Sequence, residues 1–384
     1  MSRDKSHRLA AIDLLRGAVM VLMVLDHTRD FFMVQGVRAT DLSQTTTPLF
    51  FTRWVTHFCA PGFVFLAGSA IFLAAQRRSA RERTRFLVTR GLFLVVLELT
   101  VVKFGWAPEP FYYFLLLQVI WAIGWSMVAM AGISFLPSRI VGGLGVLALV
   151  LAPLWENAEG SGAMGVVLTV LTGTGVYHPI EGHTLIVGYA ILPWLALMMC
   201  GFGFGELAKR ADFPRWSLVF GVALSFAFVG LRFLNVYGDP EPWTSQSSAT
   251  FTLLSFLNTS KYPPSLLFLL MTLGPLLVAL SLLSRVDASR APWRWLLVFG
   301  RVPLFYYVLH LWLLRVASIA CAFVVWGFGP EAYSPPPEGH AGNPGWSLAV
   351  VYLVWALALL VLYRPSRAFV ELKRRRDDWW LAYL

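Results

Sequence analysis

The sequence predicts an all-α membrane protein: a polytopic bundle of about ten transmembrane helices with both termini in the cytoplasm. Hydrophobic residues make up 57% of the 384 residues and charged residues only 14%, which is unlike a soluble globular domain. Apolar stretches of the roughly 20 residues needed to cross a bilayer recur along the whole chain. These stretches are continuous rather than alternating, so they favour helices over a membrane barrel.

Ten apolar stretches are the expected spans, and together they make residues 1–384 a single integral membrane domain. The first follows a basic start and is interrupted by Asp13 and Arg16, so we expect a retained helix that continues to about residue 32, not a cleaved signal peptide. The fifth is short and rich in Gly. The expected spans are 10–25, 58–76, 86–103, 112–136, 140–155, 184–207, 216–235, 264–284, 302–327 and 346–363.

The positions of the 31 Lys and Arg residues predict the orientation. With a cytoplasmic N-terminus, 22 of them fall at the cytoplasmic ends of the spans and 5 in the opposite loops, which is a clear positive-inside pattern. The net charge of +10 therefore reflects topology and contact with anionic lipid, not nucleic-acid binding. The excess of Arg over Lys is typical of a GC-rich bacterial genome, so we expect the bacterial cytoplasmic membrane.

Ionisable residues within the expected spans are the candidate functional residues, because each costs about 2.5 to 3.5 kcal/mol to insert into a membrane. Asp13 and Arg16 are three residues apart and can pair on one helix. Arg16 and His27 are eleven residues apart, so they share a helix face and are separated by about 16 Å. Asp26 and Asp30 flank His27, and Asp30 can fix the tautomer of a catalytic base. The alternative is a structural His at the membrane interface.

Arg53 and His57 precede the second span at the same membrane depth as His27. Consecutive antiparallel helices with short connections are usually neighbours, so these side chains are expected to meet those of the first helix in one cavity. Pro61 and Gly62 permit close packing or a local kink there. The alternative is a buried set of salt bridges that orders the two helices.

The stretch GRVPLFYYVLHLWLLR, residues 300–315, contains a third group. Arg301 marks the cytoplasmic end of a span, and His310 follows nine residues later, about 13 Å along the helix and near the middle of the bilayer. His310 either serves function or donates to a carbonyl of a neighbouring helix. The three cysteines have no metal-like spacing, so no metal site is expected.

Two stretches, RLAAIDLLRGAVMVLMVLDH and HFCAPGFVFLAGSAIFL, resemble the heparan-α-glucosaminide N-acetyltransferase catalytic-domain family, in particular a bacterial branch. The eleven-residue step from Arg16 to His27 is also similar to the signature of the wider membrane acyltransferase-3 superfamily. The resemblance implies that Arg16 belongs to an acyl-donor site and that His27 is the catalytic base or a transient acyl carrier. Residues 33–56 contain no His, so the catalytic role falls to His27 or His57.

The charge pattern and the resemblance together predict a membrane acyltransferase. It would move an acyl group, expected to be acetyl, from cytoplasmic acetyl-CoA to an amine or hydroxyl of a sugar-like acceptor at the other face. The expected catalytic residues are His27, Asp26, Asp30 and His57, with Arg53 or His57 as a stabiliser of the oxyanion. The expected substrate- and donor-binding residues are Asp13, Arg16, Arg53, Arg301 and His310.

Two other function classes remain open from the sequence. A proton-coupled secondary transporter would use His27, Asp30 and His310 as a proton relay. No internal repeat supports that interpretation. An assembly or scaffold protein would leave the clustered ionisable residues unexplained.

Overall fold

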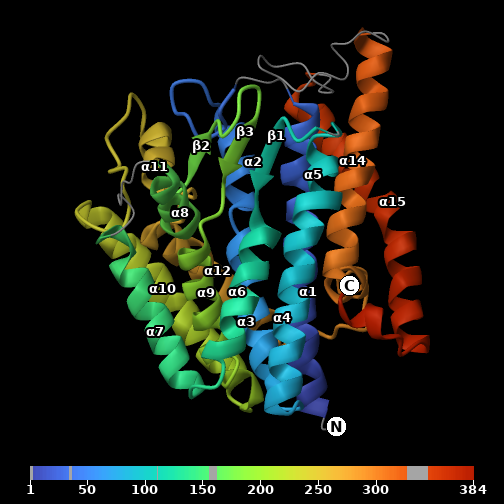
Figure 1. Cartoon of the computed structure of the whole chain (residues 1–384). Coiled ribbons are helices and arrows are strands. Elements are labelled where there is room, and N and C mark those ends of the chain that lie inside the picture. The colour runs from blue at the N-terminus through green and yellow to red at the C-terminus, as the bar shows by residue number, and fades with distance from the viewer. Residues whose placement is uncertain (1–2, 34–36, 110, 155–161, 327–344) are drawn as a thin grey trace.

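The computed structural model describes residues 3–33, 37–109, 111–154, 162–326 and 345–384, and shows a bundle of long helices with a small sheet at one end (Figure 1). The expectation of an all-α polytopic membrane bundle is confirmed. Residues 155 and 327, at the ends of two expected spans, lie outside the described residues.

The helices follow one another along the whole described chain, with three short strands between them. The α-helices are α1 (Arg3–Phe32), α2 (Thr47–Thr56), α3 (Cys59–Ala75), α4 (Ala80–Leu97), α5 (Lys103–Trp106), α6 (Val119–Ile133), α7 (Ser138–Leu151), α8 (Gly162–Thr172), α9 (Ile191–Phe204), α10 (Phe213–Leu234), α11 (Ala249–Leu257), α12 (Leu266–Leu283), α13 (Trp293–Arg301), α14 (Pro303–Trp326) and α15 (Leu348–Arg375). A π-helical turn, η1 (Glu98–Val102), joins α4 to α5, and short 3₁₀ turns are η2 (Ala152–Leu154), η3 (Leu207–Lys209) and η5 (Trp379–Ala382).

Six helical segments of the described chain are long and apolar enough to cross a membrane, so the protein is an integral membrane protein. Three further apolar helices are shorter, namely Val119–Ile133, Ser138–Leu154 and Gly162–Thr172. α1 is also long, but its charged residues set it apart from the six. The six segments are Thr47–Ala75, Ile191–Lys209, Phe213–Leu234, Leu266–Leu283, Pro303–Val325 and Leu348–Arg375.

The start of two expected spans is strand, not helix. The spans expected at 112–136 and 184–207 begin with β1 (Phe114–Leu117) and β3 (Thr184–Val187), and their helices start only at Val119 and Ile191. β1 pairs parallel with β3, which pairs antiparallel with β2 (Gly175–Tyr177). The periodicity of a four-residue apolar run does not distinguish a strand from a helix. The expected spans therefore included these strands together with the helices that follow.

The helix expected at 58–76 is preceded by a second helix on nearly the same line. α2 ends at Thr56, and α3 starts at Cys59 after a two-residue break. Pro61 lacks an N–H and cannot bond to the carbonyl of His57, which is a physical reason for the break. The break leaves Arg53, Thr56 and His57 at the junction, where they face α1 and α12.

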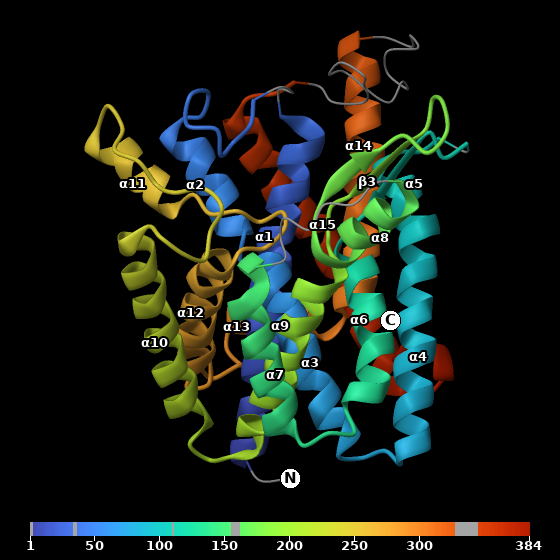
Figure 2. The ribbon, with the colours of Figure 1, turned by 60° about the vertical axis from the view of Figure 1, so that its left-hand side comes forward.

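α1 runs through the middle of the bundle and contacts α2, α3, α12, α13, α14 and α15 (Figure 2). Its approach to α13 is close because Gly residues face backbone on both sides. A Cβ at Gly17 would overlap the carbonyl oxygen of Leu296, and a Cβ at Gly300 would overlap that of Asp13. Small residues at such contacts are how membrane helices pack closely.

The two ends of the bundle differ in their connections. The start of α1 lies at the same end as the α3–α4, α6–α7 and α9–α10 turns, and we call this the basic end (Figures 1 and 2). The sheet, α2 and α11 lie at the opposite end, which we call the sheet end. The N-terminal half of α1, with Arg16, is therefore near the basic end, and its C-terminal part, with His27, is nearer the sheet end.

Candidate active site

A pair of histidines from distant parts of the chain lies inside the bundle. His27 of α1 is 9% exposed and His310 of α14 is fully buried. The Nδ1 atom of His27 lies 2.8 Å from the Nε2 atom of His310, and the Nδ1 atom of His310 lies 2.9 Å from the carbonyl oxygen of Tyr306. The two expected sites at His27 and His310 are thus one site.

The hydrogen bonds around this pair determine the tautomers of both rings when they are neutral. A carbonyl oxygen only accepts, so Nδ1–H of His310 donates to Tyr306. Nε2 of His310 then has a lone pair and accepts from Nδ1–H of His27. Nε2 of His27 is left with a lone pair, as a general base requires.

Aromatic side chains surround the pair. The ring of Trp106 lies edge-on to His27 with 5.0 Å between centroids, and the ring of Tyr307 is 6.2 Å from His27 and 5.6 Å from His310. The indole nitrogen of Trp106 and the hydroxyl of Tyr307 are both buried. Two polar donors therefore lie among apolar groups beside the imidazoles.

Asp26 is the centre of an ion-pair network on the neighbouring face of α1. Nη1 of Arg53 donates to both Asp26 oxygens at 2.6 and 2.7 Å, Nη2 of Arg29 lies 2.9 Å from Oδ1, and Oγ1 of Thr56 donates to the same oxygen at 2.9 Å. Asp26 is 8% exposed, so a buried carboxylate is held by two cations and a hydroxyl. Arg53 is thus tied to Asp26 at the junction of α2 and α3, at a distance from the basic end.

Asp30 and His57 have neighbours that the sequence did not predict. Asp30 accepts from Nη2 of Arg29 at 2.6 Å, and the bond that orients Nδ1 of His27 comes from His310. The structure places His310 at Nδ1 of His27, and the expected role of Asp30 toward the His27 tautomer stays a prediction. His57 is buried, its ring lies 5.4 Å edge-on to Phe268 of α12, and within the described residues it makes no ring contact with His27.

A cavity of about 500 Å³ extends from the basic end toward the histidine pair. Along α1 it is lined by Arg16, Met20 and Met23, and Met23 is one helical turn before His27. Along α14 it is lined up to Tyr307, whose ring neighbours both imidazoles. The volume is within the range of small-molecule sites.

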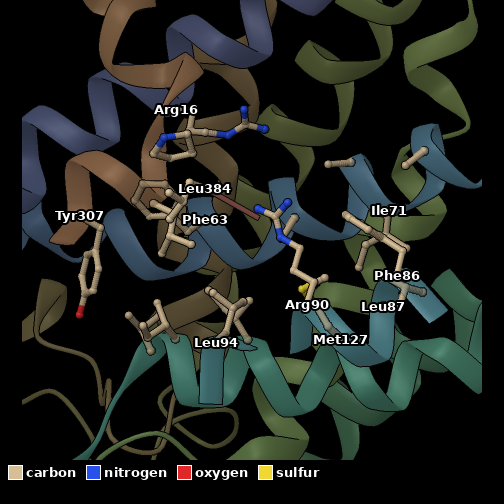
Figure 3. A pocket seen from close by; sticks show the side chains of 18 of the residues that line it. Arg16, Phe63, Ile71, Phe86, Leu87, Arg90, Leu94, Met127, Tyr307 and Leu384 are labelled. Atoms are coloured by element: carbon tan, nitrogen blue, oxygen red, sulfur yellow. The ribbon is translucent and has the colours of Figure 1, made fainter. Parts of the chain in front are cut away.

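The lining of the cavity is apolar with a set of cations. Figure 3 shows Arg90 pointing into the cavity toward Leu384, with Arg16 above it and Tyr307 at the side of the cavity. Apart from Tyr307 and the basic residues, the lining side chains are apolar, and no Asp or Glu is among the lining residues of the described chain. The basic lining residues are Arg16, Arg78, Arg83, Arg90, Arg301 and Lys373.

Asp13, Arg16 and Arg301 form the junction of α1 with α13 at the basic end. Nη1 of Arg16 donates to Oδ1 of Asp13 at 3.1 Å and to the carbonyl of Gly300 at 3.3 Å, and Nε of Arg301 lies 4.0 Å from Oδ2 of Asp13. Arg301 remains half-exposed. The structure thus brings together three of the predicted donor-site residues, and Asp13 orients both cations.

Several lining or neighbouring residues had no role in the sequence analysis. Arg90 carries the same signal as Arg16, a charge within an apolar span, and could have been found by it. Trp106 and Lys373 carry no such signal, since one is an aromatic residue among many and the other lies in a run of basic residues. No group of three His, Cys, Asp or Glu residues within the described ranges has the arrangement of a metal site.

Comparison with known proteins identifies the family. The profile described as heparan-alpha-glucosaminide N-acetyltransferase, catalytic, matches residues 8–239, which run from the first part of α1 to just beyond α10 and include Arg16, Asp26 and His27. No curated protein matches the chain. His310 and Arg301 lie beyond the matched range. More than half of the chain matches, and the chain therefore belongs to the heparan-alpha-glucosaminide N-acetyltransferase catalytic-domain family, a family of membrane acetyltransferases.

Proposed function

We propose that this protein transfers an acetyl group from cytoplasmic acetyl-CoA to an amine or hydroxyl of a sugar-like acceptor, with His27 as the general base. The observation that carries the proposal is the juxtaposition of the basic cavity with the histidine pair through Tyr307. Family membership supports the acetyl-transfer chemistry. The donor, the acceptor class and the residue roles are our inference.

The cavity supports binding of acetyl-CoA from the basic end. Six basic side chains, with no Asp or Glu among the described lining residues, suit the phosphates of CoA, and guanidinium groups bind phosphate by paired hydrogen bonds. The apolar part between α1, α4 and α14 suits the thin pantetheine arm. In this arrangement the thioester reaches the vicinity of Tyr307 and His27.

The histidine pair supports base catalysis. The acceptor amine or hydroxyl attacks the thioester carbonyl carbon while its proton passes to Nε2 of His27. The C–S bond then breaks, and the proton passes from His27 to the departing thiolate, which gives the acetylated acceptor and free CoA. The buried donors of Trp106 and Tyr307 are suited to stabilise the oxyanion between these steps.

The Asp26 network supports a site that is kept rigid next to the base. Asp26 precedes His27 on α1, and its pairs with Arg53 and Thr56 hold the end of α1 against α2. We assign Asp26, Arg53 and His57 to the architecture of the acceptor side. We further propose that the basic end faces the cytoplasm of a bacterium, that both termini are cytoplasmic, and that the acceptor arrives at the sheet end.

The test measures donor binding and transfer separately. Acetyl-CoA is titrated into detergent-purified protein by calorimetry, and acetyl transfer to glucosamine is followed with radiolabelled acetyl-CoA. Arg16→Ala is expected to weaken donor binding by about tenfold to a hundredfold, because a charge-assisted contact is lost. His27→Ala is expected to bind acetyl-CoA but to transfer about 10² to 10⁴ times more slowly.

The control is Arg290→Ala, which removes an exposed Arg paired with Asp287 outside the cavity. It is expected to match the unmodified protein in both assays. Full transfer activity in folded His27→Ala protein would contradict the role of His27. Absence of binding at millimolar acetyl-CoA would contradict the proposal that acetyl-CoA is the donor. A proton-coupled transporter would then be the better explanation of the buried histidines.

A further inference from the structure

The residues that follow α15 return to the cavity at the basic end. We call residues 376–384 the tail. Residues 376–378 are not helical, and the turn η5 follows them. Leu384 lines the cavity together with Arg90 of α4 and Tyr307 of α14, and Figure 3 shows it among the lining side chains with Arg90 to one side and Tyr307 to the other. The tail thus puts an apolar side chain into the cavity.

The tail is held in place by contacts on two sides of the cavity. On α4, the hydroxyl of Tyr383 lies 2.7 Å from Oγ1 of Thr89, and the Tyr383 ring packs on phenylalanine rings of the same helix. On the other side, Leu381 is buried in a small cluster with Val302, at the junction of α13 and α14, and Phe369 of α15. The tail therefore crosses the cavity from α14 and α15 to α4.

The connection of the tail to α15 lets the tail move as a unit. Residues 374–377 are exposed, and the helix ends at Arg375. Two backbone hydrogen bonds lie within the tail, from Leu381 to Asp378 and from Tyr383 to Trp380. Rotation at residues 376–377 keeps these bonds and breaks the side-chain contacts described above. Segments held by few buried contacts are the ones that open locally at low free energy.

A ligand that fills the cavity competes with Leu384 for space. The basic side chains and Tyr307 line the same cavity as Leu384, so a ligand that extends from the cations to Tyr307 meets the tail on its way. If only a fraction of the molecules has the tail withdrawn, the apparent affinity for the ligand is lowered by that fraction.

We propose that the tail is a gate of the donor cavity. The gate is closed while Leu384 lies in the cavity, and acetyl-CoA enters when the tail rotates away at residues 376–377. The assignment rests on the proposed function, since it specifies how access to that same donor site is regulated.

The first test removes the gate. Acetyl-CoA is titrated by calorimetry into detergent-purified protein that lacks residues 377–384, and this variant is expected to bind about tenfold more tightly than the full chain. Leu384→Ala, which shortens the lining side chain and keeps the tail attached, is expected to show a smaller change in the same direction. Thermal melting checks that each variant is folded.

The second test locks the gate. A bis-maleimide with a reducible linker joins the side chains of Thr89→Cys and Tyr383→Cys, whose hydroxyl oxygens are neighbours in the structure, in a chain whose own cysteines are replaced by Ala. The locked protein is expected to bind acetyl-CoA about tenfold more weakly than the same sample after reduction. Thr89→Cys alone, treated with the same reagent, is the control and is expected to bind equally before and after reduction.

A third readout does not depend on acetyl-CoA. Ala67 of α3 lines the cavity, so the reaction rate of Ala67→Cys with an anionic methanethiosulfonate reports access to the cavity. In the same cysteine-free background, loss of residues 377–384 is expected to raise this rate about tenfold. The rate for Ser289→Cys, in the connection of α12 to α13, is expected to stay unchanged. Faster labelling in a protein that binds no acetyl-CoA in any form would support the gate and contradict the proposed donor.

Three outcomes overturn the gate. One is an unchanged labelling rate of Ala67→Cys when the tail is removed. Another is acetyl-CoA binding that is equally tight in the locked and reduced samples. The third is weaker binding in the variant that lacks residues 377–384, which would make the tail part of the donor site instead of a barrier to it.

Discussion

At the scale of single residues, the bond between two imidazoles is the central observation. A lone His at a helix end has no fixed tautomer, but His27 bonds to His310, and His310 is held by its own helix through the Tyr306 carbonyl. In this series of two hydrogen bonds each acceptor has one possible donor. The neutral His27 ring therefore carries its proton on Nδ1 and its lone pair on Nε2. His310 is thus a positioning residue for the proposed base.

Substitution of His310 tests that role. His310→Leu removes the acceptor for Nδ1–H of His27, so kcat for acetyl transfer is expected to fall about a hundredfold while KM for acetyl-CoA stays within about twofold. His310→Gln, whose amide oxygen can accept the same hydrogen bond, is expected to recover part of kcat. Equal loss in Gln and Leu variants with a raised KM would indicate a packing role instead.

At the scale of elements, α4 forms much of the wall of the proposed donor cavity. Its residues Arg83, Phe86, Arg90 and Leu94 line the cavity, so the position of its start matters for the proposed site. A capping box fixes that start: the Glu82 N–H donates to Oγ of Ser79 at 3.3 Å, and the Ser79 N–H donates to Oε2 of Glu82 at 2.8 Å. This signal, Ser followed three residues later by Glu, is local and readable in sequence.

Removal of the cap is expected to lower stability in a pH-dependent way. Ser79→Ala should lower Tm in detergent by about 2–4 °C at pH 7, with Ser247→Ala in an exposed loop as control. The Ser79 N–H and hydroxyl hold the pKa of Glu82 below its usual range. The contribution of the Glu82 carboxylate to folding stability is therefore complete above the pKa of about 4.3 that Glu has in the unfolded chain. It is lost as the pH falls through the lower pKa of Glu82 in the folded protein. A Tm difference that does not narrow in acid would argue against the reciprocal box.

At the scale of the whole molecule, α1 links the two ends of the bundle. Its basic-end residues are bonded to α13, its middle faces the cavity, and its C-terminal part carries His27 and the Asp26 network. Gly17 and Gly300 let α1 and α13 meet backbone to backbone, which brings Arg301 within reach of Asp13. One helix thus spans from the proposed donor entrance to the proposed acceptor side.

The proposed orientation can be tested in cells. Ser289→Cys lies in the exposed connection of α12 to α13 at 284–292, and Ser247→Cys lies in the connection of α10 to α11 at 235–248. With a membrane-impermeant maleimide, Ser247→Cys is expected to react in intact spheroplasts of an expressing bacterium and Ser289→Cys only after permeabilisation. The reverse pattern would invert the orientation and exclude cytoplasmic donor entry.

The sequence by itself determined that the protein lies in a membrane and where its main helices are. Apolar runs of membrane length predicted the bundle, and the 3.6-residue period predicted that Arg16 and His27 share a face of α1. These properties are local, because length, hydropathy and helical phase depend on neighbouring residues. The expected spans joined β1 and β3 to the helices after them, because local properties do not reveal strand pairing, which is a contact between distant segments.

Only the tertiary structure decided the partners of the site. His27 and His310 are 283 residues apart, and Arg53 bonds Asp26 across two helices. The cations of the cavity come from α1, α3–α4, α13 and α15. Which helices are neighbours, and how each is rotated about its axis, follows from the packing of the whole bundle. For that reason Arg16, His27 and His310 were named from the sequence, while Arg90 and Trp106, and the contacts that join these residues, were found only in the structure.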